Sequence, residues 1–297
     1  MARFIQSLPE TQSNLLLAGY TKTIAAKRRS MIMGGVILLL CIVISAHVGE
    51  VRPGKLISDF PKFFDYIGRL FYLDSGKLAF TDPYEWFWGV TQKPKWLKLL
   101  FETLLIAYLG TLIGFIGGFV LSFFAARNMG RSRWLAALAK RWLEICRTVP
   151  ELVFALIFVV AFGLGPLPGV IALAIHSTGA LGKLFTEVVE NIDMKPVEGL
   201  QAAGASWAQT VRFAAVPQVL PSFVSYGLLR FEINVREASI MGFVGAGGIG
   251  DELLISIRKF YYSDVSAILI LLIITVMLID LGTEQLRHRL SAAEQTK

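Results

Sequence analysis

Residues 197–217 read VEGLQAAGASWAQTVRFAAVP, and this polar stretch lies between two apolar runs of the chain. We expect a short helix to begin at Glu198, where an acidic side chain complements the helix dipole. Gly204 marks a turn that needs a residue without a Cβ atom, and Pro217 can open the next helix. The stretch therefore predicts a helix, a turn and a second helix that protrude from one side of a membrane. The alternative is an ordinary cytoplasmic loop.

The composition requires a membrane around those apolar runs. Hydrophobic residues make up 55% of the 297 residues, charged residues make up 17%, and the mean hydropathy is +0.60. A soluble domain has about 25% charged residues, so the apolar excess must face lipid. The formal net charge of +7 indicates basic cytoplasmic loops and not nucleic-acid binding, because the basic residues flank apolar runs. Cys41 and Cys146 predict neither a disulfide nor a metal site.

Six apolar runs are expected to cross the membrane as helices, at about residues 31–46, 99–126, 149–164, 169–189, 217–236 and 265–282. The first run lacks a signal-peptide cleavage site and is expected to be retained. A tight turn rich in glycine and proline joins the third and fourth spans on the outer side. Basic residues before the first span and after the last one place both chain ends in the cytoplasm. The predicted fold class is an all-α integral membrane protein with six transmembrane helices.

The stretch between the first two spans is mixed in character. Residues 60–71 place apolar and charged side chains on opposite faces of a helix. This pattern predicts an amphipathic helix on the outer membrane surface. Trp86, Trp88 and Trp96 fit the aromatic belt at a membrane–water interface.

The spacing of Glu198, Gly204 and Pro217 resembles the signature of ABC importer permeases. That signature is Glu-Ala-Ala, three residues, Gly, and nine residues before Ile-x-Leu-Pro. Gly199 and Leu200 replace the two alanines here, and Ala214 and Val216 stand for the Ile and the Leu. In that family the loop docks into a groove of a cytoplasmic ATPase and transmits its closure to the spans. The resemblance assigns this coupling role to Glu198, Gly199, Ala203, Gly204, Ala205, Ser206 and Pro217.

Further stretches extend the resemblance from about residue 99 to the C-terminus. GFVGAGGIG at 242–250 is similar to an outer segment of methionine-type and phosphonate-type importer permeases. RFEINVREAS at 230–239, RTVPELVFALIFVVAFGLGP at 147–166 and HSTGALGKL at 176–184 resemble the phosphonate permeases in particular. The expected outer gate is made of Gly245, Gly247, Gly248 and Gly250.

The resemblance implies a type I ABC importer permease fold with an extra N-terminal helix, in a bacterial cytoplasmic membrane. The charge and hydropathy pattern, together with this resemblance from about residue 99 onward, divides the chain into a cytoplasmic segment at 1–30, the first span and an extracytoplasmic segment at 31–98, the permease core at 99–287 with the coupling loop at 190–216, and a cytoplasmic tail at 288–297. The implied partners are a second copy of the chain, two ATPase subunits and an extracytoplasmic binding protein. ATP and Mg are bound by the ATPase, and this chain is expected to hold no cofactor or metal.

Four charged residues fall in or at the end of the fifth predicted span, namely Arg230, Glu232, Arg236 and Glu237. Charges inside a membrane cost several kcal/mol each and normally face a partner or a watery path. Glu232 and Arg236 are four residues apart, so one interpretation is a structural pair on one helix face. The other is a polar lining for an oxyanion, which suits the planar guanidinium of Arg. His176, Ser177 and Thr178 are expected to add donors from another span. Lys183 and Glu187 predict a structural pair near the inner face.

The expected cargo is a phosphonate or phosphite-like oxyanion, and methionine or another amino acid is the alternative within the importer class. A secondary transporter is a second alternative, and it would need inverted repeats or unpaired acids at mid-membrane, neither of which the sequence clearly shows. A GxGD-type intramembrane protease is a third alternative, because residues 248–251 spell that motif, although its second aspartate, Asp280, is expected at the opposite face. Gly245, Gly247 and Gly250 also spell a dinucleotide fingerprint, but such a site needs a preceding strand. The sequence contains no P-loop, HExxH or GxSxG motif, so the chain itself is not expected to be an enzyme.

Overall fold

The computed structural model describes residues 10–88, 95–129 and 132–295, and it is helical nearly throughout. In the described part of the chain, the only β pairing is an isolated bridge between Tyr72 and Leu78. The predicted all-α class is confirmed.

The chain divides after Asp65 into two compact units, each of which is described by itself. The first unit contains α2 (Glu10–Val48), which begins well before the predicted span at 31–46 and continues through the basic residues in front of it. Its part from Ala18 to Val48 is long and apolar enough to cross a membrane, and the side chains of that part are almost all exposed. Such a surface suits lipid. The division lies inside the predicted segment 31–98, and the predicted partition of the chain stays a prediction.

The predicted amphipathic helix is present as α3 (Pro53–Arg69), which starts earlier than the sequence pattern indicates. Phe60, Phe63 and Phe64 are all exposed, and the ring of Phe64 lies edge to face with those of Phe60 and Phe63 at centroid distances of 5.2 and 5.7 Å. An exposed aromatic cluster on an amphipathic helix is typical of helices that lie in a membrane interface.

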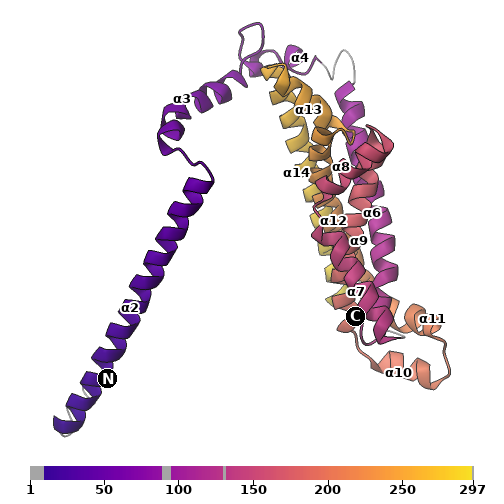
Figure 1. The fold of residues 1–297 in the computed structure, drawn as a ribbon. Helices are drawn as coiled ribbons and strands as arrows, with labels where there is room; N and C mark the ends of the chain where they lie inside the picture. Colours follow the sequence, from indigo (N-terminus) through magenta and orange to yellow (C-terminus); the bar gives the residue numbers. More distant parts are fainter. Residues whose placement is uncertain (1–9, 89–94, 130–131, 296–297) are drawn as a thin grey trace. The chain divides into compact units, whose positions relative to one another are not determined.

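The second unit is a helical bundle (Figure 1). Its long helices are α6 (Lys95–Ala125), α7 (Arg133–Thr148), α8 (Glu151–Phe162), α9 (Pro166–Glu190), α12 (Val216–Met241) and α14 (Tyr262–Gln295). Glycines bring α6 and α9 together, because a Cβ atom on Gly118 would lie 2.8 Å from the backbone nitrogen of Gly182. Small residues allow such close packing in lipid, where hydrophobic exclusion does not drive association.

The number of candidate spans depends on how bent helices are counted. Within the described residues, four helices are long and apolar enough to cross a membrane, in α2, α6, α9 and α14. The number is six if α7 with α8 forms one span bent by 84°, and if α12 with the helix that follows it forms another, bent by 49°. The prediction of six spans agrees with the second count.

The third predicted span, at 149–164, needs a correction. The helix there is α8, and its 12 residues reach only about 18 Å, which is too short for the hydrocarbon core. Val149 and Pro150 have extended backbones that separate α8 from α7. A proline removes a backbone donor and disfavours a helical residue before it. Only α7 and α8 together are long and apolar enough to cross a membrane, and that pair is bent by 84°.

The two ends of the second unit carry different short elements (Figure 1). One end holds α10 (Lys195–Ala202), α11 (Trp207–Thr210) and the π-helix Val211–Ala215. The opposite end holds α4 (Pro83–Trp86) and α13 (Ile249–Arg258), with the 3₁₀ turns Ala79–Thr81 and Gly242–Val244.

The predicted aromatic belt is wrong for two of its three tryptophans. Trp86 and Trp96 are 5% and 3% exposed and belong to a core cluster with α13 and α14. The indole nitrogen of Trp86 donates to the Ser266 hydroxyl at 2.8 Å, so a partner inside the protein replaces interfacial water. Trp88 is 43% exposed and donates to Asp264 at 3.3 Å.

Candidate functional site

The predicted coupling loop is a helix, a turn and a helix, as its sequence indicates. α10 begins at Lys195, three residues before the expected start, so Glu198 lies in its first turn instead of opening it. Pro196, inside that turn, explains the earlier start, because proline is favoured at the first helical positions. Gly204 has a φ of +81°, which strongly favours glycine. Pro217 is the second residue of α12.

Most of the residues assigned to coupling are on the surface. Ser206 is the N-cap residue of α11, and its backbone N–H donates to the Gln209 side chain at 2.8 Å. Ala205 is half-buried, and the exposed members are Glu198, Gly199, Ala203, Gly204, Ser206 and Pro217. A rigid turn with exposed backbone at the end of a bundle is suited to docking on another protein.

Buried contacts connect this exposed loop to the spans. Val197 is fully buried in a cluster with Phe185 of α9 and Phe223 of α12. The indole N–H of Trp207 donates to the Met129 carbonyl at 2.8 Å, and its ring stacks on Phe124 of α6 at 5.0 Å. A displacement of the loop would therefore be passed to α6, α9 and α12 together. A π-helix joins α11 to α12, and such elements frequently occur at functional sites.

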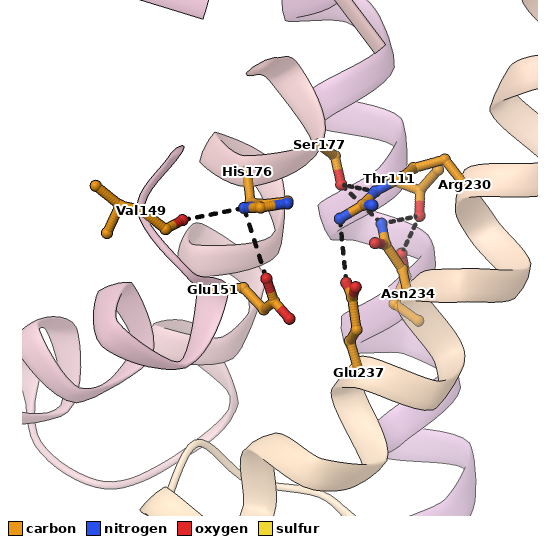
Figure 2. Close-up of polar contacts among 9 residues, drawn as sticks. Thr111, Val149, Glu151, His176, Ser177, Arg230, Asn234 and Glu237 are labelled. Carbon is orange, nitrogen blue, oxygen red and sulfur yellow. Dashed lines mark hydrogen bonds and ion pairs between the residues drawn. The ribbon is translucent and has the colours of Figure 1, made fainter. Parts of the chain in front are cut away.

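Arg230 is the centre of a buried polar cluster in the middle of α12 (Figure 2). It is 9% exposed; its Nε donates to Ser177 Oγ at 3.2 Å, and its Nη2 lies 3.1 Å from Glu237 Oε2. Asn234 Nδ2 donates to Ser177 Oγ at 2.8 Å and to Thr111 Oγ1 at 2.7 Å. The cluster thus joins α6, α9 and α12, and one charge pair is neutralised within it. Asn234 Oδ1 is buried and has no partner among the described residues.

His176 lies next to Ser177 but faces α8 (Figure 2). Its Nδ1 is 3.2 Å from the Val149 carbonyl and 3.5 Å from Glu151 Oε2. Both neighbours can only accept, so Nδ1 carries a hydrogen. Val149 interrupts the helical backbone between α7 and α8. Irregular backbone of this kind is tolerated at membrane depth where it is buried in protein or lines a cavity.

A cavity of about 570 Å³ adjoins the break between α7 and α8. Its lining residues are Arg147, Thr148, His176, Ala180, Lys183, Leu184 and Glu187. Lys183 and Glu187 form the predicted structural pair at 3.1 Å, with both side chains about half exposed. The lining holds two fixed cations and one carboxylate, so it is suited to an anionic solute.

The structure separates the remaining predicted path residues from the Arg230 cluster. Glu232 pairs with Arg236, as the structural interpretation predicts, and Arg287 of α14 lies 4.0 Å from the other carboxylate oxygen of Glu232. Thr178 donates to the Ala174 carbonyl of its own helix at 2.7 Å and lies against Gly117, so it does not join the cluster.

Four polar residues of these clusters were not predicted from the sequence, namely Thr111, Glu151, Asn234 and Arg287. For two of them, the sequence contains a pattern that could have indicated their role. Asn234 follows Arg230 by four residues and therefore shares its helix face. Glu151 opens an otherwise uncharged run after a proline. Thr111 and Arg287 depend on which helices are neighbours, and one chain's sequence pattern does not give that.

The glycine segment predicted as an outer gate packs against the turn between α8 and α9. Gly245, Gly247 and Gly248 have φ angles of +78°, +83° and +82°. The Gly165 N–H donates to the Gly245 carbonyl at 3.0 Å. A Cβ atom on Gly250 would overlap the Ser239 carbonyl oxygen. The glycines are thus required by backbone geometry and close packing, and their role as a gate stays a prediction.

Comparison with known proteins identifies the kind of transporter component. A family model described as "Binding-protein-dependent transport system inner membrane component" matches residues 118–292, more than half of the chain. The chain belongs to this family. The phosphite transport system permease protein PtxC of Stutzerimonas stutzeri is similar, with 36% identity over 284 residues that cover 95% of this chain and 96% of that protein. The phosphate-import permease protein PhnE of Mycolicibacterium smegmatis is 40% identical over 178 residues, 60% of this chain and 34% of that protein.

Solved structures of permeases share the fold. The inward facing MetNI methionine ABC transporter aligns with a TM-score of 0.57 at 20% identity, over 67% of this chain and 98% of that chain. The predicted family and the type I importer permease fold are confirmed. Family membership implies an inner-membrane permease that associates with an ATPase and a substrate-binding protein.

Proposed function

We propose that this chain is the membrane permease subunit of an ABC importer that moves a phosphonate or phosphite-like oxyanion into the cytoplasm. The observation that carries the proposal is the exposed helix–turn–helix of residues 195–210, which Trp207 and Val197 connect to three spans. The similarity to a phosphite transport permease supports the cargo class. So does the cavity lined by Arg147, Lys183 and His176, because basic side chains recognise oxyanions through charge-assisted hydrogen bonds.

The permease works as a homodimer in this proposal. One chain carries one coupling loop, whereas a pair of ATPase subunits needs two. The exposed Lys183–Glu187 pair on α9 supports this arrangement, because charged side chains at membrane depth face a partner or a watery path rather than lipid. Both chain ends and the coupling loop lie on the cytoplasmic side, and α4 and α13 lie on the extracytoplasmic side.

The transport cycle follows from the contacts of the loop. ATP and Mg bind to the partner ATPase subunits, and closure of these subunits pushes the segment from Glu198 to Pro217 toward its copy in the second permease. Because Trp207 joins this segment to the end of α6, the spans rotate with it and open outward. The extracytoplasmic binding protein then delivers the oxyanion, and nucleotide release returns the spans to the inward state.

Uptake by the reconstituted importer tests the cargo. We expect vesicles that contain the permease and its ATPase to accumulate labelled phosphite or methylphosphonate when ATP and the binding protein are both supplied. Labelled methionine is the matched alternative cargo. Accumulation of methionine instead would contradict the oxyanion assignment. Accumulation that stops with a proton or sodium ionophore and continues without ATP would instead identify a secondary transporter.

Arg236 provides a test of the translocation path. Its side chain is 53% exposed, and its partner Glu232 keeps a second cation, Arg287, at 4.0 Å. Arg236→Ala therefore does not leave a buried carboxylate unpaired, and assembly and ATP hydrolysis should stay normal. We expect loss of oxyanion uptake, because the variant lacks the guanidinium that the path interpretation assigns to the oxyanion. Arg52→Ala, which removes an arginine that is 70% exposed in the first unit, is the matched control. Wild-type uptake by the Arg236 variant would remove this residue from the path.

A further inference from the structure

A second cavity, of about 660 Å³, lies at the end of the bundle that carries the coupling loop, where α6 ends and α7 begins. Its lining residues are Arg127, Ser132, Arg133, Ala136, Ala137, Lys140, Arg141 and Glu144. Four of these side chains are basic and one is acidic. The cavity shares no residue with the one beside His176, so it is separate from the proposed cargo path.

The acids near this cavity are already engaged. Glu190, at the end of α9, accepts from Lys140 at 2.8 Å and from the backbone N–H of Arg127 at 3.0 Å. Glu144 pairs with Arg141 at 2.5 Å. Among the described residues, no carboxylate forms an ion pair with the side chain of Arg127 or Arg133. The positive end of the α7 dipole adds to the charge of these two guanidinium groups. The cavity is thus built for an anion.

The apolar side of α7 indicates what kind of anion. Trp134, Leu138 and Trp142 are spaced by four residues on one helix face, and they are 87%, 69% and 57% exposed. Tryptophan is enriched where a membrane meets water. The cavity and this apolar face belong to the same helix, so a ligand that fits both has an anionic head and a long apolar body. A phospholipid supplies both parts in one molecule.

We propose that the Arg127–Arg133 cavity binds the headgroup of one anionic phospholipid, whose acyl chains lie along Trp134, Leu138 and Trp142. Basic pockets between spans on the cytoplasmic side are suited to such headgroups. Two residues beyond Arg127, the carbonyl of Met129 holds Trp207 of the coupling loop. The bound lipid therefore stabilises the segment after α6 to which Trp207 attaches the loop. Because this attachment transmits ATPase closure to the spans, ATP-driven transport depends on anionic lipid.

Native mass spectrometry of the intact transporter complex tests this site. The probes are phosphatidylglycerol and phosphatidylcholine with identical acyl chains, titrated onto the delipidated complex. We expect the wild type to bind phosphatidylglycerol more tightly. Arg127→Gln with Arg133→Gln is expected to weaken that binding by about twenty-fivefold, because each basic residue near an anionic headgroup contributes roughly fivefold. Arg133→Gln alone, at an exposed position, should weaken it by roughly fivefold and covers the case in which the double variant fails to fold.

Arg258→Gln with Lys259→Gln is the matched control, since both residues are exposed at the opposite end of the bundle. It should bind phosphatidylglycerol as the wild type does. Equal binding of the two lipids, or wild-type binding by the Arg127 and Arg133 variants, would overturn the proposal. Displacement of phosphatidylglycerol by millimolar inorganic phosphate would assign the cavity to a free anion. Loss of the ATPase subunit from the variants with unchanged lipid binding would assign it to that partner.

Discussion

Replacement of Arg230 by glutamine is expected to reduce oxyanion uptake strongly and to destabilise the permease. The change removes the donor to Ser177 and leaves Glu237, whose side chain is 20% exposed, without its partner at 3.1 Å. Breaking a buried ion pair by removing one partner costs about 3–5 kcal/mol. The free energy of unfolding of the purified complex should fall by about that amount, and uptake in vesicles should fall by at least about tenfold, as expected for loss of a hydrogen bond to a charged group.

The double variant Arg230→Gln with Glu237→Gln separates stability from transport. It leaves no unpaired charge in the pair, so the free energy of unfolding should return most of the way to that of the wild type. Uptake should stay low, because the guanidinium is still missing. If the double variant transports at the wild-type rate, the cluster only holds α9 against α12, and Arg230 is not part of the path.

Replacement of Trp207 by alanine is expected to uncouple ATP hydrolysis from transport. The substitution removes the 2.8 Å hydrogen bond to Met129 and the ring that stacks on Phe124. The exposed coupling residues are unchanged, so the ATPase still docks and hydrolyses ATP, but its closure is no longer passed to α6. We expect uptake per ATP hydrolysed to fall by at least about tenfold, since a hydrogen bond and an aromatic stacking contact are lost together.

Trp207→Phe is the matched control for this prediction. It keeps the stacking on Phe124 and removes only the N–H donor, so its coupling ratio should lie between those of the wild type and the alanine variant. Uptake and ATP hydrolysis are measured on the same vesicle preparation. A fall of both activities in equal proportion in Trp207→Ala would indicate lost assembly and would contradict a role in coupling.

Local chemistry explains what the sequence could predict. Gly204 and Pro217 have backbone requirements that few other residues meet, so the turn and the start of α12 were readable. The Glu232–Arg236 and Lys183–Glu187 pairs follow from helical spacing alone. The family signature then added the coupling role, which no property of the isolated loop would reveal.

Long-range packing explains what the sequence could not predict. Tryptophan is typical of a membrane interface, so the sequence placed Trp86 there. Only its contact with Ser266, 180 positions away, shows that it is buried. Pro150 marks the break between α7 and α8, but the sequence does not show that α7 packs on Gly179 of α9, where no side chain would fit. Arg230 and Glu237 are two helical turns apart, and their pairing required burial between α9 and α12.

Disulfide cross-linking at Ser206 tests the central claim most directly. That claim is that residues 195–210 lie in the cytoplasm, dock on an ATPase subunit and transmit its closure to the spans. Cys41 and Cys146 are first replaced by serine, and Ser206→Cys is introduced together with single cysteines along the ATPase groove. We expect a product with the combined mass of permease and ATPase, formed at a rate that changes when ATP is added. No such product, or labelling of the introduced thiol by an impermeant maleimide from outside intact cells, would contradict it.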